Sequence, residues 1–279
     1  MLSRKEERIL RIITYIVLIC GVVVVAIPFL YMISTSIKSQ TYTFEYPPRL
    51  IPKNPTLENY VEALGKDRFG LYFLNSLFVA TITTISTIVV SSLMAYAFSR
   101  TSFPGKEIFF YTLLTGMMIP STMLIIPQFI IAKNLHLLNS LWGLIIIYVT
   151  MSLSMQTFLL RGFFEVIPRE LEEAVLIDGG TQWTIFFKII LPLTRPGLAV
   201  VAIFTFLYSW DEFPWAHVAI RNISRRTLPV AIALFQNQYL TKWGLVFAAS
   251  IVALIPVIGV FVIFQKYFIR GLMSGAIKG

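Results

Sequence analysis

The chain has 279 residues, of which 57% are hydrophobic and only 13% are charged. Ordinary soluble domains carry about 25% charged residues, so this composition excludes a typical soluble fold and favours a chain that lies in a lipid bilayer. The net charge of +9 would suggest nucleic-acid binding in a soluble protein. However, no basic run with interleaved aromatic residues is present, and basic residues that flank membrane spans explain the charge better, so we expect no nucleic-acid partner.

Six apolar segments are long enough to cross a bilayer as helices, which takes about 20 residues each. They cover residues 12–34, 71–98, 108–131, 141–159, 197–220 and 244–265. The first run is longer than the apolar region of a signal peptide and lacks a small-residue cleavage site, so we expect it to be retained as a span. It contains the single cysteine, Cys20, which can form no intrachain disulfide and is expected to act as apolar filler.

These segments predict an all-α polytopic membrane protein with six transmembrane helices, organised as one domain over residues 1–279. Backbone polar groups in lipid must pair with each other, which leaves helices and closed barrels, and the residue alternation of a barrel is absent. We expect prolines to kink four of the helices, at Pro28, Pro120, Pro127, Pro214 and Pro256.

The distribution of basic residues predicts that both termini lie in the cytoplasm. The N-terminal tail holds Arg4, Lys5, Arg8 and Arg11, and the segments on its side of the membrane carry a modest excess of basic residues. On the opposite side, residues 41–70 and 222–243 combine proline or polar residues with aromatics. These two connectors could contact a soluble partner or a polar ligand, or could be simple connections, and both interpretations stay open.

The long charged stretch between the fourth and fifth spans, residues 166–192, is called the elbow segment below. Its first half predicts an acidic helix after Pro168, because Glu170, Glu172 and Glu173 are favoured near a helix N-terminus. Helical spacing puts a further set on one face, where the small Ala174 would let a partner approach closely. This set is Leu171, Ala174, Val175 and Asp178.

The second half of the elbow segment predicts a stop and a second helix. Gly179 and Gly180 can adopt the left-handed conformation that ends a helix. Thr181 can then cap a helix over residues 182–190, which ends at Leu191 and Pro192. A helix pair resting on lipid is the alternative, but glutamates clustered on an anionic membrane surface would be repelled, so a basic protein cleft explains them better.

Motifs for covalent chemistry, nucleotide binding and metal binding are absent from the sequence. There is no G-x-x-x-x-G-K-[ST], no H-E-x-x-H, no G-x-S-x-G and no Cys/His spacing typical of a metal site. His136 and His217 are isolated. We therefore expect neither an enzyme nor a chain that binds a cofactor or metal, and no motif here could hydrolyse ATP.

The elbow segment closely resembles the EAA loop of the membrane subunits of bacterial ATP-binding-cassette importers, a cytoplasmic coupling-helix loop between spans 4 and 5. The matching residues are Glu173-Ala174-Val175, Gly179 and Ile189-x-Leu191-Pro192, with Val175 departing mildly from the small residue of the motif. Further stretches are similar to the carbohydrate-uptake-1 subfamily, specifically its maltose-type second permease. They are residues 34–38, 75–77, 95–100, 103–105, 207–213 and 265–279.

This resemblance implies a bacterial or archaeal cytoplasmic-membrane permease that works with other subunits. The implied partners are a second related permease, two copies of a cytoplasmic ATPase that holds ATP and Mg²⁺, and an external solute-binding protein. The resemblance implies ATPase coupling through Glu170, Glu172, Glu173, Ala174, Asp178, Gly179, Leu191 and Pro192. It also implies that the C-terminal tail, residues 266–279, contacts the ATPase, with Ser274, Gly275 and Lys278 as candidates.

Polar residues within the spans are the candidates for the solute pathway. Asp211 and Glu212 lie in an apolar run, where an ionisable side chain costs about 2.5–3.5 kcal/mol, so each either faces a water-filled cavity or forms a structural bond to another span. The neighbouring Trp210 could stack on a sugar, although packing explains it better. Asn75, Gln128 and Gln156 are weaker candidates.

Two rival functions remain alongside a sugar importer subunit, whose sugar the sequence does not specify. The first is a permease for another polar solute, such as glycerol phosphate or a peptide. The second is a secondary carrier, which would need an ion relay and usually internal repeats, and neither is evident.

Overall fold

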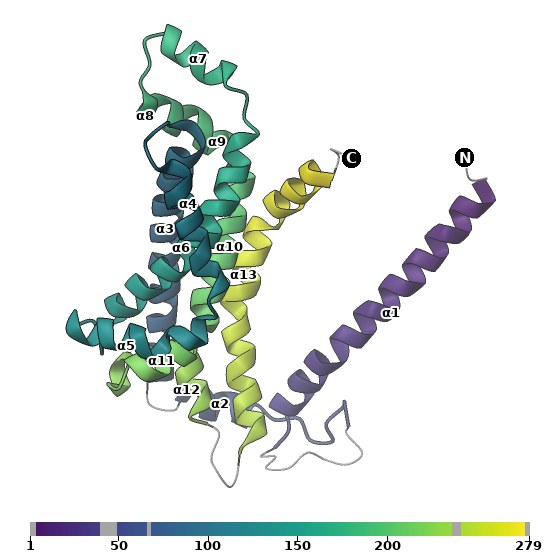
Figure 1. Cartoon of the computed structure of the whole chain (residues 1–279). Coiled ribbons are helices and arrows are strands. Elements are labelled where there is room, and N and C mark those ends of the chain that lie inside the picture. The colour runs from purple at the N-terminus through teal and green to yellow at the C-terminus, as the bar shows by residue number, and fades with distance from the viewer. Residues whose placement is uncertain (1–3, 40–48, 66–67, 236–240, 277–279) are drawn as a thin grey trace. The chain divides into compact units, whose positions relative to one another are not determined.

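A computed structural model describes residues 4–39, 49–65, 68–235 and 241–276 of the chain (Figure 1). Within this part the regular elements are helices, and the only bridge is an isolated antiparallel pairing of Lys38 with Pro55. The predicted all-α class is therefore confirmed. The long helices are α1 (Arg4–Ser36), α3 (Phe69–Arg100), α6 (Leu141–Glu165), α10 (Arg195–Asp211) and α13 (Trp243–Ala276). The shorter elements are α2 (Glu58–Gly65), α4 (Lys106–Thr115), η1 (Gly116–Met118), η2 (Ser121–Leu124), α5 (Ile125–Asn134), α7 (Glu170–Ile177), α8 (Gln182–Ile185), η3 (Phe186–Ile190), α9 (Leu191–Leu193), α11 (Pro214–Ala219), η4 (Ile223–Arg225) and α12 (Leu228–Ala233).

Four of the described helices are long and apolar enough to cross a membrane. They cover Arg8–Ser36, Phe69–Arg100, Leu141–Glu165 and Trp243–Lys266. Two bent helix pairs also pass the same test: Lys106–Met118 with Ser121–Asn134, bent by 96°, and Gln182–Leu193 with Arg195–Asp211, bent by 75°. The number of spans reaches the predicted six when each bent pair is taken as one span.

The third and fifth spans differ from the continuous helices that we predicted. Pro120 separates η1 from η2, because a proline lacks the N–H group and disfavours a helical residue before it. The predicted helix 197–220 is broken after Asp211, and Pro214 starts the short helix α11. Pro28 and Pro256 lie within the helices α1 and α13, and Pro127 lies in the first turn of α5.

The two connectors predicted as loops contain short helices. α2 lies within residues 41–70, and η4 and α12 lie within residues 222–243. Periodicity is hard to recognise in elements of three to eight residues, which explains why the sequence did not indicate them. Residues 41–48, 66–67 and 236–240 of these connectors lie outside the described part.

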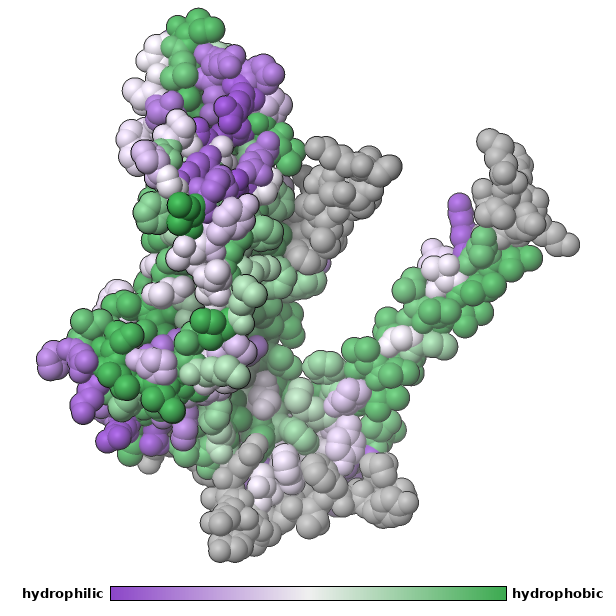
Figure 2. All heavy atoms as spheres, in the orientation of Figure 1, coloured by the Kyte–Doolittle hydropathy of each residue, from purple (hydrophilic) through white to green (hydrophobic). Residues whose placement is uncertain are grey.

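The contacts divide the chain into two compact units, and the first consists of residues 1–69 with residues 232–254. In this unit the side chain of Asn59 donates hydrogen bonds to the carbonyls of Ser36 and Lys38, at 2.9 and 2.6 Å, and so holds the end of α1. Lys242 forms an ion pair with Glu62 at 2.9 Å. The apolar side chains of α1 are exposed along most of its length (Figure 2), as expected of a helix surrounded by lipid.

The second unit consists of residues 70–231 with residues 255–279, and it contains both the elbow segment and the pathway candidates. α6 packs against α10, and α3 contributes a buried face made of small residues, which let helices approach closely. This face consists of Ser76, Ala80, Thr83, Thr87, Ser91 and Ala95. Two apolar clusters form the core: one around Tyr148 and Trp215, the other around Tyr96, Phe164 and Ile190.

The second helix of the elbow segment contains a π-helical turn. α8 continues into the π turn η3, which α9 follows directly. A π turn holds one more residue per turn than an α-helix. Phe186 and Ile190 are both buried in the second cluster, while Lys188 is exposed. The predicted helix 182–190 is thus present, with an α start and a π end.

Candidate functional site

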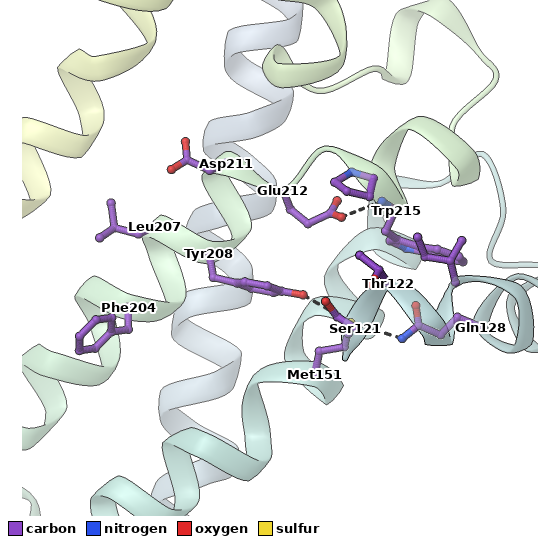
Figure 3. Close-up of a pocket in the computed structure, with 12 residues that line it drawn as sticks. Ser121, Thr122, Gln128, Met151, Phe204, Leu207, Tyr208, Asp211, Glu212 and Trp215 are labelled. Carbon is purple, nitrogen blue, oxygen red and sulfur yellow. Dashed lines mark hydrogen bonds between the residues drawn. The ribbon is translucent and has the colours of Figure 1, made fainter. Parts of the chain in front are cut away.

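A cavity of about 470 Å³ lies beside the break between α10 and α11 (Figure 3). Its volume falls within the range of small-molecule sites, about 300–1,000 Å³. Three of the predicted pathway residues line it: Gln128, Asp211 and Glu212. Among the residues that the structure describes, no lysine, arginine or histidine lines it. The cavity therefore combines carboxylates, a carboxamide, hydroxyls and apolar side chains, without a positive charge.

The side chain of Glu212 stabilises the break between α10 and α11 through three hydrogen bonds. One carboxylate oxygen accepts the backbone N–H of Trp215 at 2.7 Å (Figure 3), and the other accepts that of Ala216 at 3.0 Å. The second oxygen also accepts the hydroxyl of Tyr148, from α6, at 2.5 Å. Because the first N–H groups of a helix lack partners in the helix, this side chain satisfies donors that would otherwise be unpaired in an apolar setting.

Asp211 contrasts with its neighbour. Its side chain is exposed and lines the cavity, and it makes no hydrogen bond or ion pair within the described residues. On the opposite wall, the Met151 sulfur accepts the amide of Gln128 at 3.3 Å and the hydroxyl of Tyr208 at 3.4 Å (Figure 3). Sulfur is a weak acceptor, so both groups remain able to exchange it for a better partner.

The other pathway candidates lie outside the lining of this cavity. Trp210 is almost fully buried, stacks on Phe206 and packs edge-on against Phe73, as expected for a packing residue. Asn75 donates two hydrogen bonds to backbone carbonyls in the segment 224–226. Gln156 is buried, and its amide oxygen has no partner among the described residues.

Among the cavity residues and supports that sequence reasoning missed are Tyr148, Met151, Tyr208 and Trp215. Tyr208 precedes Asp211 and Glu212 by three and four positions, so helical spacing could have placed it on their face. Trp215 lines the cavity, and its indole N–H is buried without a partner among the described residues. Tyr148 and Met151 come from α6, and nothing in the local sequence links them to Glu212.

The elbow segment folds as two helices joined at Gly179, which has a φ of +79°. This left-handed conformation disfavours side chains with a Cβ, which accounts for glycine there. Gly180 has an ordinary φ, but a Cβ there would lie 2.8 Å from the carbonyl oxygen of Val175. Thr181 caps α8 as predicted, by accepting the N–H of Thr184 in a capping box.

Most side chains of α7 are exposed, and only Glu172 and Val175 are half-buried. Glu170, Glu173, Ala174 and Asp178 are exposed, and so are the apolar side chains of Leu171, Leu176 and Ile177, the last at 86%. Glu172 instead forms an ion pair with Arg100 of α3, with 2.9 Å between Oε1 and Nε. The structure thus gives this predicted coupling residue a partner inside its own chain.

The remaining predicted contact residues lie elsewhere on the second unit. Leu191 and Pro192 are half-buried in α9, where the π turn ends. Ser274 and Gly275 lie in the last turns of α13, so the helix includes most of the predicted tail, while Lys278 lies outside the described residues. Among the residues that the structure describes, no group of His, Cys, Asp or Glu side chains could hold a metal ion.

Comparison with known proteins shows extensive similarity. A family described as binding-protein-dependent transport system inner membrane component matches residues 87–274. The sulfoquinovosyl glycerol transport system permease protein SmoH of Agrobacterium fabrum is 37% identical over 90% of this chain and 88% of its own. The trehalose/maltose transport system permease protein MalG of Thermococcus litoralis is 35% identical over 99% of both chains.

A solved structure shares the fold over nearly the whole length. It is the crystal structure of a bacterial ABC transporter involved in the import of the acidic polysaccharide alginate. The TM-score is 0.81 at 25% sequence identity, and the match covers 96% of this chain and 99% of that chain.

Proposed function

Because the chain belongs to the family of inner membrane components of binding-protein-dependent transport systems, we propose that it forms one half of a sugar pathway driven by separate ATPase subunits. It is a multi-pass permease subunit of an ABC importer, and a transport protein rather than an enzyme. The pathway would be completed by a second, related permease, and an external binding protein would deliver the solute. Both termini would lie in the cytoplasm, and ATP and Mg²⁺ would bind in two copies of the ATPase.

The observation that carries this proposal is the exposed surface of α7, which suits protein docking better than lipid. Leu171, Leu176 and Ile177 present apolar area to solvent, and Glu170 and Glu173 lie on the same short helix. Hydrophilic side chains gather over this end of the second unit (Figure 2). Carboxylates beside an anionic membrane surface are repelled, whereas an apolar patch with a charged rim is typical of a protein interface.

The chemistry of the cavity supports a neutral solute. Asp211 and Glu212 would repel a phosphate, sulfonate or carboxylate, and no basic residue of the lining would offset that repulsion. The hydroxyls of a sugar could instead bond to the carboxylate of Asp211 and the amide of Gln128. A neutral mono- or oligosaccharide is therefore favoured over the anionic alternative, glycerol phosphate.

The first experiment identifies the solute. A solute-binding protein that supports transport by this permease is purified, and its thermal stability is measured with trehalose, maltose and diacetylchitobiose, and with sulfoquinovosyl glycerol as an anionic comparison. We expect a neutral sugar to stabilise it, and the complete transporter in vesicles to accumulate that sugar. Vanadate should abolish accumulation and a proton uncoupler should not. The reverse pattern would identify a secondary carrier and refute the proposal.

The docking surface is tested by a charge placed in its apolar centre. Ile177→Asp should reduce the amount of ATPase that copurifies with the permeases by about tenfold or more, as expected for a central interface residue. Ile223→Asp is the matched control, because Ile223 is another exposed isoleucine, on η4, away from the elbow segment. Equal copurification of the ATPase with both variants would show that α7 is not the docking surface.

A further inference from the structure

The last turn of α3 is bonded to both helices of the elbow segment. Tyr96 and Arg100 are four residues apart, so they lie on one face of α3. The Tyr96 hydroxyl donates to the side-chain oxygen of Gln182, in α8, at 2.6 Å. Arg100 pairs with Glu172, in α7, at 2.9 Å. Each helix of the elbow segment is thus fastened to α3 by its own polar contact.

Arg100 is almost entirely buried, which makes its contacts consequential. The side chain is 4% exposed, and that of Glu172 is 13% exposed. The Nη2 atom of Arg100 donates hydrogen bonds to the carbonyls of Phe164 and Ile167, at 2.5 and 2.7 Å, at the C-terminal end of α6. A buried ion pair adds little stability over an apolar pair, but removing one partner leaves an uncompensated charge and is strongly unfavourable. The helices α3, α6 and α7, which Arg100 connects, should therefore move together.

Apolar packing around Tyr96 reinforces the polar contacts. Its ring packs edge-on against Phe186 of the π turn, with ring centroids 5.2 Å apart. The same cluster contains Ile185 and Ile190 of the elbow segment together with Leu160 and Phe164 of α6. Because buried side chains are close-packed, a displacement of the elbow segment is transmitted to its neighbours rather than absorbed.

The opposite end of α3 is bonded to a different part of the chain. Asn75 donates to the carbonyls of Ser224 and Arg226, at 3.0 and 2.9 Å. The hydroxyl of Ser76 accepts the backbone N–H of Leu228 at 2.8 Å. With a rise of about 1.5 Å per residue, the helix from Asn75 to Arg100 is roughly 37 Å long. α3 therefore joins the elbow segment to the connector 224–228 at the far end of the same unit.

We propose that Tyr96 and Arg100 are positioning residues for coupling, which lock the elbow segment to α3 so that its movement reaches the far connector through one rigid helix. The inference rests on the proposed function, since it assumes that the elbow segment docks on an ATPase. It also assigns Glu172 to this internal attachment and leaves the exposed Glu170 and Glu173 to the docking surface.

The test uses the complete transporter in vesicles, with ATP hydrolysis measured with and without the binding protein loaded with its sugar. Arg100→Met should leave basal hydrolysis and the copurified ATPase unchanged. The stimulation by the loaded binding protein should fall about tenfold, the size of a typical coupling free energy. Glu172→Gln should act similarly, and the double variant should be no worse than either single one, because both remove the same contact.

The matched control is Arg161→Met. Arg161 also pairs with a glutamate, Glu165, at 2.7 Å, near the C-terminal end of α6, but none of its described contacts reaches the elbow segment. Its stimulation should stay within about twofold of the unmodified transporter. Tyr96→Phe provides a milder variant that keeps the packed ring, and the loss of one hydrogen bond should lower stimulation by about fivefold.

Three outcomes decide between the possibilities. Unchanged stimulation in the Arg100 and Tyr96 variants would overturn this inference and leave the proposed function intact. Loss of copurified ATPase in parallel with stimulation would show that the two residues only maintain the fold, and would also overturn it. An unmodified transporter without sugar-stimulated hydrolysis would instead refute the proposed function.

Discussion

Replacing Glu212 with glutamine tests how the break between α10 and α11 is stabilised. The carboxylate accepts three hydrogen bonds, from the backbone N–H groups of Trp215 and Ala216 and from the hydroxyl of Tyr148. A glutamine side chain has one acceptor oxygen, and its NH₂ group must then face at least one of these donors. We therefore expect Glu212→Gln to leave one backbone N–H unpaired and to convert the remaining bonds from charged to neutral ones.

The size of the destabilisation by Glu212→Gln follows from these two losses. An unpaired buried donor costs about 1–3 kcal/mol, and a charge-assisted hydrogen bond is roughly twice as strong as a neutral one. Together they predict a decrease of about 2–4 kcal/mol in the free energy of unfolding. The quantity can be measured on the purified transporter as unfolding in SDS–detergent mixtures, followed by loss of helical circular dichroism.

The adjacent carboxylate supplies the control. Asp211→Asn removes the same charge one residue earlier, but Asp211 makes no hydrogen bond or ion pair within the described residues, so the change in unfolding free energy should stay within about 0.5 kcal/mol. Equal destabilisation by the two variants would show that charge, rather than the three hydrogen bonds, matters at this break, and the reasoning would fail.

Three further predictions concern two sets of hydrogen bonds and one backbone conformation. Tyr148→Phe removes one of the three donors to Glu212 and should lower the free energy of unfolding by about 1–2 kcal/mol in the same SDS assay. Gly179→Ala should lower the free energy of unfolding by about 1–2 kcal/mol because of the positive φ at this position. The control is Gly162→Ala, in the helix α6, which has open space around the added Cβ and should raise the free energy of unfolding by about 0.5–1 kcal/mol. Unfolding temperatures that moved in the same direction for both variants would contradict this prediction. Asn75→Leu leaves two carbonyls of the connector without donors, so protease cleavage within residues 220–228 should become at least about fivefold faster, and an unchanged cleavage rate would show that these bonds do not hold the connector.

Much of the fold followed from the sequence, because long apolar runs and glycine stops are local signals. The six segments, the helix α7 and the turn at Gly179 depend on hydropathy and backbone conformation alone. We predicted a kink at Pro214 but not the complete break after Asp211, because the run 197–220 is apolar on both sides of it. A carboxylate that caps a new helix within a span looks, in the sequence, like a carboxylate that faces a pathway.

The candidate site was predicted only in part, for reasons that concern tertiary contacts. Gln128, Asp211 and Glu212, which the sequence offered as pathway candidates, line one cavity, and Tyr148 bonds to Glu212 from a helix 64 positions earlier in the chain. The resemblance to the EAA loop implied that Glu172 contacts an external ATPase. Its pairing with Arg100 depends on where α3 ends relative to α7, which no local pattern encodes.

The π-helical turn Phe186–Ile190 has a consequence for the direction in which α7 projects. Each residue of an α-helix rotates the chain by about 100°, so the additional residue in this turn rotates α8 about its own axis by that angle relative to α9. A chain that lacked one residue there, for instance the exposed Lys188, would point α7 more than a quarter-turn away from the face that Tyr96 and Arg100 hold. The number of residues in this short turn therefore sets the direction in which α7 projects.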